Sequence, residues 1–185
     1  MIKLAMLDRD GVLNAQRADF VKSPDEWQAL AGAADAVARL NRAGIKVAIV
    51  TNQSCVGRGI VSAEMLQRIH HKMRAHLAQV GASVDEILVC TDPPWAAGER
   101  RKPAPGMLRE AMRRFAVAPP QAVMIGDDLR DLQAAAAAGC ARILVRTGKG
   151  AQTQGAGLPS EVLPVGVCAD LAEAVERLVG AEAAA

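Results

Sequence analysis

Two aspartates one residue apart, Asp8 and Asp10, end an apolar run in the stretch MLDRDGVLN and are followed directly by Gly11. Unpaired carboxylates cost on the order of several kcal/mol away from water. Either the strand ends here with its acids facing solvent, or the two acids hold a cation. Gly11 permits a sharp turn, which lets both carboxylates face one point.

Polar groups follow three further apolar runs in the same way. They are Thr51, Asn52, Gln53 and Ser54 after the second run, Arg101 and Lys102 in the loop after the third, and Asp127 and Asp128 after the fourth, with Asp131 one turn later. Acids that lie close together repel one another unless a cation lies among them. Oxygen ligands with few dedicated carboxylates favour Mg²⁺. A metal beside a hydroxyl, a lysine and backbone amides suits a phosphoryl group.

These side chains must be positioned by short strands with helices between them. Short, continuous apolar runs predict strands at 2–7, 45–50, 87–90, 122–125 and 143–145, with a candidate sixth at 165–168. Amphipathic patterns and end signals predict helices at 33–43, 63–80, 105–115, 129–138 and 170–179, the last ending at Gly180. The Gly- and Pro-rich segments 91–104 and 147–164 are expected to be loops.

This alternation predicts an α/β fold, a three-layer doubly wound parallel sheet with right-handed crossovers. Ligands bind such sheets outside the carboxyl ends of the strands, so the polar groups should meet at one edge. The length of 185 residues favours a single domain over 1–185. The 40 residues between Asp10 and Thr51, and the 50 between Thr51 and Lys102, leave no room for a cap domain.

The composition of the chain argues against nucleic-acid and membrane partners. A net charge of +2 and a pI of about 8.4 are too mild to indicate nucleic-acid binding. The four cysteines are widely spaced with no CxxC pair, which argues against a disulfide framework and suits a reducing compartment. No apolar run reaches about 18 residues, and Asp8 comes too early for a signal peptide. We therefore expect a cytoplasmic monomer without a membrane or nucleic-acid partner.

The ordered motifs DRDG, TNQS, RKP and GDDLRD resemble those of the haloacid dehalogenase-like phosphohydrolases. In that family a DxDG, a Ser or Thr, a Lys and a GD pair follow successive strands. The longer segments DRDGVLN, TNQSCVGRG, RKPAPGM and GDDLRDLQAAAAAG are similar to those of its histidinol-phosphate and heptose-bisphosphate branch, most of all to the heptose-bisphosphate phosphatases. The resemblance covers nearly the whole chain.

The resemblance implies a role for each motif. Asp8 would be the nucleophile, forming an aspartyl-phosphate, and a Mg²⁺ ligand. Asp10 would be general acid and then base, with its backbone carbonyl on the metal. Thr51 and Lys102 would hold the phosphoryl oxygens, and Asp127 would complete the metal site. Electrostatics supports these roles, because Mg²⁺ and a lysine offset the repulsion between a carboxylate and a phosphate dianion.

The implied reaction is Mg²⁺-dependent removal of the 7-phosphate of a heptose 1,7-bisphosphate, on the route to bacterial lipopolysaccharide. Two alternatives stay open: a phosphatase acting on histidinol phosphate or another small phosphomonoester, and a non-catalytic phosphate-binding protein. The planar guanidinium of arginine can donate two hydrogen bonds to phosphate oxygens. Arginines near the site are therefore candidates for binding a second phosphate. The residues expected to contact the substrate are Arg17, Asn52, Gln53, Ser54, Arg58, Arg101 and Asp128, with Asp131 as a supporting residue.

The chain departs from this branch at two places. The branch carries a zinc clip before RKP, but VCTDPPWAAGERRKP has Cys90, an aspartate at 92 in place of histidine, and no Cys-x-Cys, so we expect no zinc. Cys55 stands where the branch has glycine, and we interpret it as a small residue without a reactive role. His70, His71 and His76 are predicted to be surface histidines. Trp95 either closes over the substrate or folds its loop down.

Overall fold

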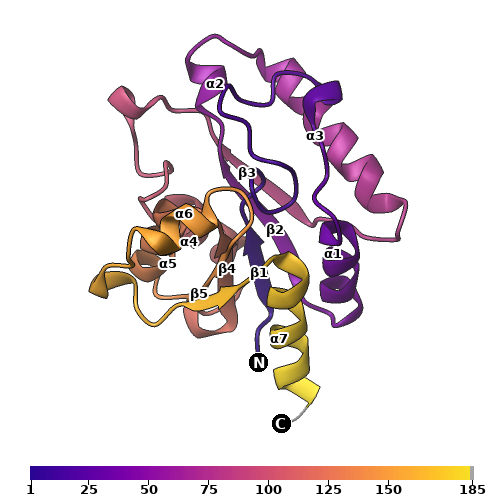
Figure 1. Ribbon diagram of the computed structural model, residues 1–185, viewed down its shortest axis with the longest axis vertical. Coiled ribbons are helices and arrows are strands. Elements are labelled where there is room, and N and C mark those ends of the chain that lie inside the picture. The colour runs from indigo at the N-terminus through magenta and orange to yellow at the C-terminus, as the bar shows by residue number, and fades with distance from the viewer. Residues whose placement is uncertain (184–185) are drawn as a thin grey trace.

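The computed structural model describes residues 1–183 and contains a six-stranded, all-parallel sheet. The strands are β1 (Leu4–Leu7), β2 (Lys46–Asn52), β3 (Glu86–Cys90), β4 (Ala122–Gly126), β5 (Ala141–Val145) and β6 (Gly166–Cys168). Their order across the sheet is β3-β2-β1-β4-β5-β6 (Figure 1). This confirms the predicted doubly wound parallel sheet and its sixth strand.

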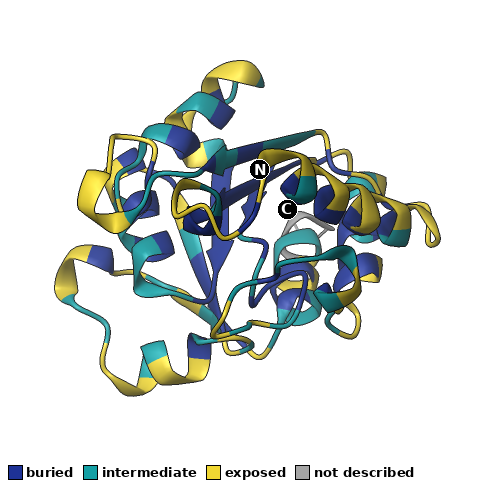
Figure 2. Cartoon of the chain, turned by 90° about the horizontal axis from the view of Figure 1, so that it is seen from above, coloured by how far each residue is buried: buried dark blue, intermediate teal, exposed yellow. Residues whose placement is uncertain are grey.

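Helices cover both faces of the sheet. On one face α1 (Ala33–Arg42), α3 (Ala63–Ala78) and α7 (Leu171–Ala183) pack on side chains such as Leu7 and Ile49. On the other face α4 (Gly106–Arg114) and α5 (Leu129–Ala138) pack on side chains such as Met6 and Val50. The strands are therefore buried on both sides, as their continuous apolar runs require (Figure 2).

The connecting segments hold the remaining short elements. They are η1 (Pro24–Glu26), α2 (Ser54–Gly57), η2 (Pro94–Ala96), η3 (Pro119–Gln121), α6 (Gly150–Gly155) and η4 (Ser160–Val162). Within residues 1–183 none of these connections contains a separate cap domain. No helix in this part of the chain is long and apolar enough to cross a membrane.

Two sequence predictions about elements were wrong. The predicted loop 147–164 contains helix α6, which lacks apolar periodicity but is held by the Thr153 hydroxyl donating to the Asp127 backbone carbonyl at 2.9 Å. The predicted stop at Gly180 is also wrong, because α7 continues to Ala183. A glycine inside a helix costs only about 1 kcal/mol relative to alanine, too little to end a helix by itself.

The strand order places the site. It reverses between β1 and β4, which are neighbours although three strands apart in the chain. A crevice at such a point, outside the carboxyl ends, is where open α/β sheets bind ligands. Asp8 leaves β1 and Asp127 leaves β4 at this edge, because Leu7 and Ile125 are paired across the two strands.

Candidate active site

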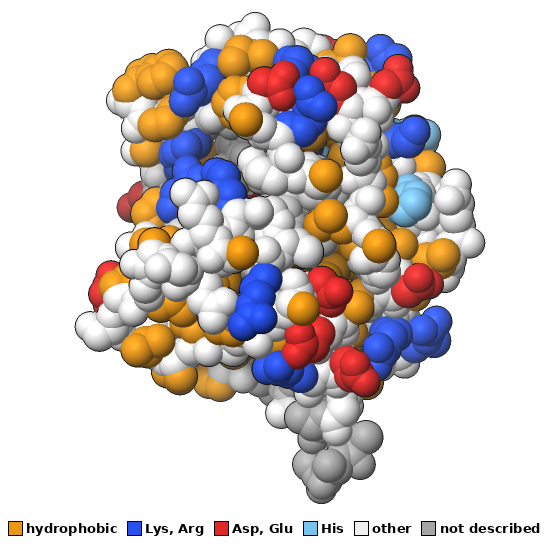
Figure 3. All heavy atoms as spheres, in the orientation of Figure 1, with side chains coloured by type: hydrophobic (Ala, Val, Ile, Leu, Met, Phe, Trp, Pro, Cys, Tyr) orange, Lys and Arg blue, Asp and Glu red, His pale blue; other side chains and the backbone are white. Residues whose placement is uncertain are grey.

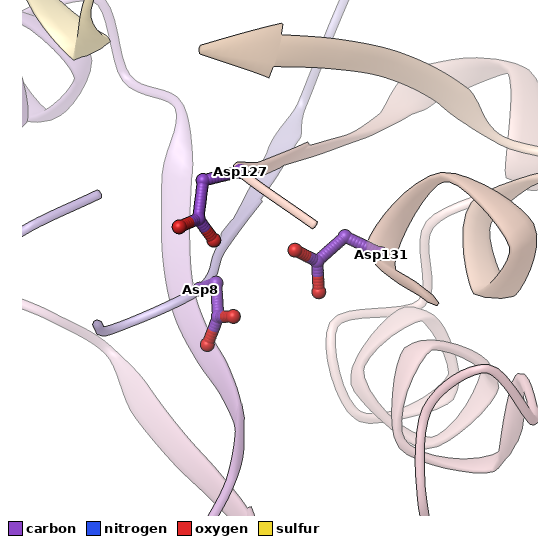
Figure 4. Close-up of side chains that lie close together, drawn as sticks. All are labelled: Asp8, Asp127 and Asp131. Carbon is purple, nitrogen blue, oxygen red and sulfur yellow. The ribbon is translucent and has the colours of Figure 1, made fainter. Parts of the chain in front are cut away.

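Three carboxylates meet above the crevice between β1 and β4. Asp8 comes from the end of β1, Asp127 from the end of β4, and Asp131 from the first turn of α5. One oxygen of each lies within 4.8 Å of the others, and Figure 4 shows the three side chains close together. Acids at such a separation raise one another's pKa values unless a cation neutralises them.

Glycines allow these acids to approach the backbone. Gly11 has φ of +82°, a conformation that side chains rarely adopt, and a Cβ built on it would lie 2.0 Å from Oδ2 of Asp127. A Cβ on Gly126 would lie 2.2 Å from Oδ2 of Asp131. Gly11 therefore makes the sharp turn expected from the sequence and also leaves room for Asp127.

Lys102 is the cation inside this cluster. Its ammonium group lies 3.1 Å from Oδ2 of Asp8 and 2.6 Å from Oδ1 of Asp131, and it donates to the Val50 carbonyl. Burial lowers the pKa of Lys102, but the charges of Asp131 and Asp8 outweigh burial and raise it. Asn52 holds the loop in place, because its side-chain amide pairs with both the N–H and the carbonyl of Lys102.

The cluster carries more negative charge than Lys102 can neutralise. Burial raises the pKa of Asp8 to about 6, with Asp131 and Asp10 adding to the shift against the opposing charge of Lys102. Burial, followed by the charges of Asp8 and Asp131, raises the pKa of Asp127 to about 8. Three oxygen ligands with excess negative charge fit a hard divalent cation such as Mg²⁺.

Asp10 stands apart from that cluster. Its carboxylate accepts hydrogen bonds from the side chains of Asn14 and Gln53, each at 2.7 Å, and pairs with Arg9 at 3.0 Å. Burial raises the pKa of Asp10, but the Arg9 charge and these hydrogen bonds outweigh burial and lower it. Its side chain is therefore charged and held in one orientation, while Asp131 supplies the third carboxylate of the cluster.

A cavity opens over these groups and is lined mostly by charged side chains. In Figure 3, Lys and Arg side chains gather beside a hollow in the upper part of the face shown. The predicted residues that line the cavity are Asp8, Asp10, Arg17, Asn52, Gln53, Ser54, Arg101, Lys102, Asp127, Asp128 and Asp131. It is also lined by Gln16, Phe20, Val21, Arg130 and Lys149, which the sequence analysis did not single out.

Two predicted residues, Thr51 and Arg58, do not line the cavity. Thr51 is 1% exposed, and its hydroxyl accepts from Gln53 at 2.9 Å, which leaves its own hydrogen free to donate. The Arg58 guanidinium lies 5.8 Å from the ring centre of Phe20 and 5.0 Å from that of Trp95. Trp95 is 72% exposed at this stack and does not line the cavity either. Their contacts with substrate stay predictions.

The prediction of three surface histidines was wrong for His70, which is buried. It follows Ile69, a core residue of α3, and its Nε2 lies 3.3 Å from Nη1 of the buried Arg9. His71 is exposed, as predicted, and His76 is half-buried with its ring edge-on to Trp27.

The sequence analysis did not identify two cations at the rim of the cavity, Arg130 and Lys149. Asp128 caps α5 and is paired with Arg130 at 2.7 Å and with Lys149 at 3.5 Å. Burial raises the pKa of Asp128, but its hydrogen bonds from Arg130 outweigh burial and lower it. Lys149 follows the carboxyl end of β5, so the same strand-end argument, continued to the fifth strand, would have found it.

The purified protein should contain no stoichiometric zinc. Cys90 is buried at the end of β3, and in residues 1–183 the three aspartates are the one group of His, Cys or acidic side chains close enough to share a metal. These oxygen ligands are harder than the N/S set that structural zinc requires. Elemental analysis of the purified protein checks this, and close to one zinc per chain would contradict it.

Family models and relatives match the chain along most of its length. A model described as polynucleotide kinase 3 phosphatase matches residues 3–132, and one described as HAD-hydrolase-like matches residues 99–174. A D-glycero-beta-D-manno-heptose-1,7-bisphosphate 7-phosphatase of Bordetella bronchiseptica is 48% identical over 96% of this chain and 98% of that protein. One of Pseudomonas putida is 38% identical over 96% and 100%.

A solved structure agrees with the fold over the same extent. The crystal structure of D,D-heptose 1,7-bisphosphate phosphatase from B. bronchiseptica, complexed with magnesium and phosphate, superposes with a TM-score of 0.92. It covers 97% of this chain and 99% of the crystallised chain, at 48% identity. The likeness therefore includes every strand that carries a site residue.

Proposed function

The chain belongs to the haloacid dehalogenase-like hydrolases, in the family of the heptose-1,7-bisphosphate 7-phosphatases, and we propose that it removes the 7-phosphate of D-glycero-D-manno-heptose 1,7-bisphosphate. The observation that carries this proposal is the cluster at the β1–β4 crevice. This cluster brings the carboxylate of Asp8 close to Lys102 and to two further acids, in a cavity with cations around its rim.

Asp8 starts the reaction by attacking the phosphorus of the 7-phosphate. The bond between phosphorus and the sugar oxygen breaks, Asp8 carries the phosphoryl group, and Asp10 gives a proton to the leaving oxygen. Water then attacks the phosphorus while Asp10 takes the water's proton, which releases phosphate and restores Asp8. Lys102 and the Thr51 hydroxyl stabilise the phosphoryl oxygens during both steps.

Asp8, Asp127 and Asp131 would hold Mg²⁺, with the backbone carbonyl of Asp10 as a further ligand. Mg²⁺ at this place supplies positive charge that offsets the repulsion between the nucleophile and the phosphate. In the free protein Asp10 is ionised, because Arg9, Asn14 and Gln53 favour its charged form. A bound phosphate brings negative charge nearby and raises the pKa of Asp10, so Asp10 takes up a proton from solvent as the substrate binds and holds it when the attack begins.

The substrate's second phosphate accounts for the remaining cations. Arg101 is 8% exposed, lines the cavity, and donates from Nη1 to the Asp92 carbonyl at 2.7 Å, which orients its guanidinium. Arg17, Arg130 and Lys149 also reach the cavity wall. Because the site has no cap domain, these side chains are the groups that can bind the 1-phosphate and the sugar.

Steady-state kinetics on three substrates test the proposal. We expect kcat/KM to be highest for the heptose 1,7-bisphosphate, well above the values for histidinol phosphate and p-nitrophenyl phosphate. A higher value for histidinol phosphate would assign the chain to the other activity of this branch. An absence of turnover on all three with Mg²⁺ present would leave a phosphate-binding protein.

Arg101→Ala should weaken use of the bisphosphate selectively. Loss of an arginine that only binds raises KM and leaves kcat nearly unchanged. The cost in kcat/KM should be about 2 kcal/mol for the bisphosphate, from the range for hydrogen bonds to charged groups, and far smaller for p-nitrophenyl phosphate. Both constants come from initial rates on the two substrates.

Arg100→Ala is the matched control, because Arg100 is exposed and pairs with Glu110 outside the cavity. It should leave both substrates unaffected. Equal losses on the two substrates in Arg101→Ala would mean that Arg101 serves the chemistry, and selection would then belong to Arg17, Arg130 or Lys149.

The proposal extends to the setting of the enzyme. We propose a single domain over residues 1–185 that acts as a monomer in the cytoplasm, without nucleic-acid or membrane partners. All four cysteines are free and buried, which suits a reducing compartment. The cations of the site surround a small cavity rather than an extended groove, which suits a small phosphorylated sugar.

A further inference from the structure

In the sequence, an arginine with no exposed surface separates the two catalytic acids. Arg9 is 0% exposed, and its Nη2 donates to both oxygens of Asp10 and to Oε1 of Gln53, each at 3.0 Å. Its other terminal nitrogen, Nη1, lies 3.3 Å from Nε2 of His70. The side chain that orients Asp10 is thus itself held by a residue of helix α3, 61 positions away.

The chemistry of the pair defines the state of His70. A guanidinium has donors only, so Nε2 of His70 must accept the hydrogen bond, and the ring is neutral with its hydrogen on Nδ1. Burial, and after it the Arg9 charge, lower the pKa of His70 to about 4, which agrees with a neutral ring near pH 7. Asp10 opposes this shift and Arg74 adds to it.

Gln53 closes the network on its other side. Its Nε2 donates to Oδ2 of Asp10 at 2.7 Å and to the Thr51 hydroxyl at 2.9 Å, so its Oε1 must face Arg9. Gln53 is 2% exposed and all its polar atoms are used. It lines the cavity, so its expected contact with substrate stays a prediction, and these bonds also make it a link between Asp10 and Thr51.

We propose that His70 is a positioning residue for Asp10, acting through Arg9, and that it serves the proton transfer to the leaving sugar oxygen. Removing His70 leaves a buried N–H of Arg9 without its acceptor, which is costly, so the guanidinium turns toward other partners. Asp10 then loses a two-point contact. Proton transfer depends on the donor lying within hydrogen-bond reach, so this displacement slows it. The inference rests on the proposed function, in which Asp10 is the general acid.

The test compares two leaving groups. An alkoxide needs a proton as it leaves, whereas p-nitrophenolate is a stable anion and leaves without one. His70→Leu should therefore lower kcat/KM for the heptose bisphosphate on the order of tenfold, a part of the 10²–10⁴ that acid–base catalysis contributes. KM should change little, and kcat/KM for p-nitrophenyl phosphate should stay within about twofold, because that constant reports only the steps through leaving-group release.

Two further variants make the result specific. His70→Gln carries an amide oxygen that can accept from Arg9, and it should restore most of the lost rate on the bisphosphate. His71→Leu changes the exposed neighbour on the same helix and should behave as wild type. Thermal unfolding of each variant, with p-nitrophenyl phosphate turnover, reports whether the fold and the phosphoryl site are intact.

The inference is overturned if His70→Leu slows both substrates equally, if it slows neither, or if His70→Gln is as slow as His70→Leu. The comparison works with any alkyl phosphate that the wild type hydrolyses. If the wild type ignores the heptose bisphosphate, the proposed substrate is wrong, and the role of His70 is still decided on that other alkyl phosphate.

Discussion

Asp8→Asn should abolish turnover while the protein remains folded. The amide keeps the shape of the side chain but cannot attack phosphorus, and it removes one negative charge from the metal site. Loss of even one transition-state donor costs roughly 10²–10³ in rate, so the remaining activity should be below about a hundredth of the wild-type value. The measurement is the initial rate on the bisphosphate and on p-nitrophenyl phosphate.

Thermal unfolding without Mg²⁺ separates this effect from misfolding. Burial raises the pKa of Asp8, so the buried charge opposes folding near pH 7, and its removal should not lower the unfolding temperature. Asp35→Asn, on the exposed face of α1, is the matched control and should keep full activity. A rate above about a hundredth of wild type in Asp8→Asn would contradict the assignment of the nucleophile.

Chelation with EDTA should also abolish turnover, and added Mg²⁺ should restore it. Without the metal, Lys102, which pairs with Asp8 and Asp131, is the cation left inside the cluster to oppose its repulsion toward the incoming phosphate, since the other cations lie at the rim of the cavity. That is too little positive charge for one carboxylate to attack a phosphate dianion. Rates before chelation, after it, and after adding Mg²⁺ measure the requirement, and full activity in EDTA would refute it.

The demand for Mg²⁺ should increase as the pH falls. The metal needs ionised carboxylates, but in the metal-free protein the pKa of Asp127 is about 8 and that of Asp8 about 6. Protons therefore compete with Mg²⁺ below pH 8, and binding the metal releases them. The Mg²⁺ concentration that gives half the maximal rate should rise steadily from pH 8 to pH 6. A constant value over that range would count against these carboxylates as ligands.

The sheet and the clustering of the main candidate site residues were predictable because both follow from local patterns. Strands buried on two faces are continuous apolar runs, and the polar residues directly after them must gather at one edge of a parallel sheet. That argument was sufficient to place Asp8, Asp127 and Lys102 together, as the structure has them. The sequence alone does not assign Asp131 to the cluster, because an aspartate in the first turn of a helix is also explained by capping. In the structure Asp131 completes the capping box of α5 and also pairs with Lys102.

The rest depends on contacts between distant parts of the chain. Periodicity places His70 beside the core residue Ile69 but cannot tell that Arg9 reaches it from the first loop. The packing of Arg58 between Phe20 and Trp95 joins three segments that no local signal connects. Helix α6 was missed because glycine-rich sequence usually indicates a loop, whereas contacts with Asp127 hold this helix.

The measurement that tests the central claim most directly is ³¹P NMR of D-glycero-D-manno-heptose 1,7-bisphosphate during incubation with the protein and Mg²⁺. The account predicts that the signal of the 7-phosphate disappears, that inorganic phosphate appears in equal amount, and that the 1-phosphate signal persists. The Asp8→Asn protein should leave both signals in place. Loss of the 1-phosphate first, or no change with the wild-type protein, would contradict the claim that this site removes the 7-phosphate.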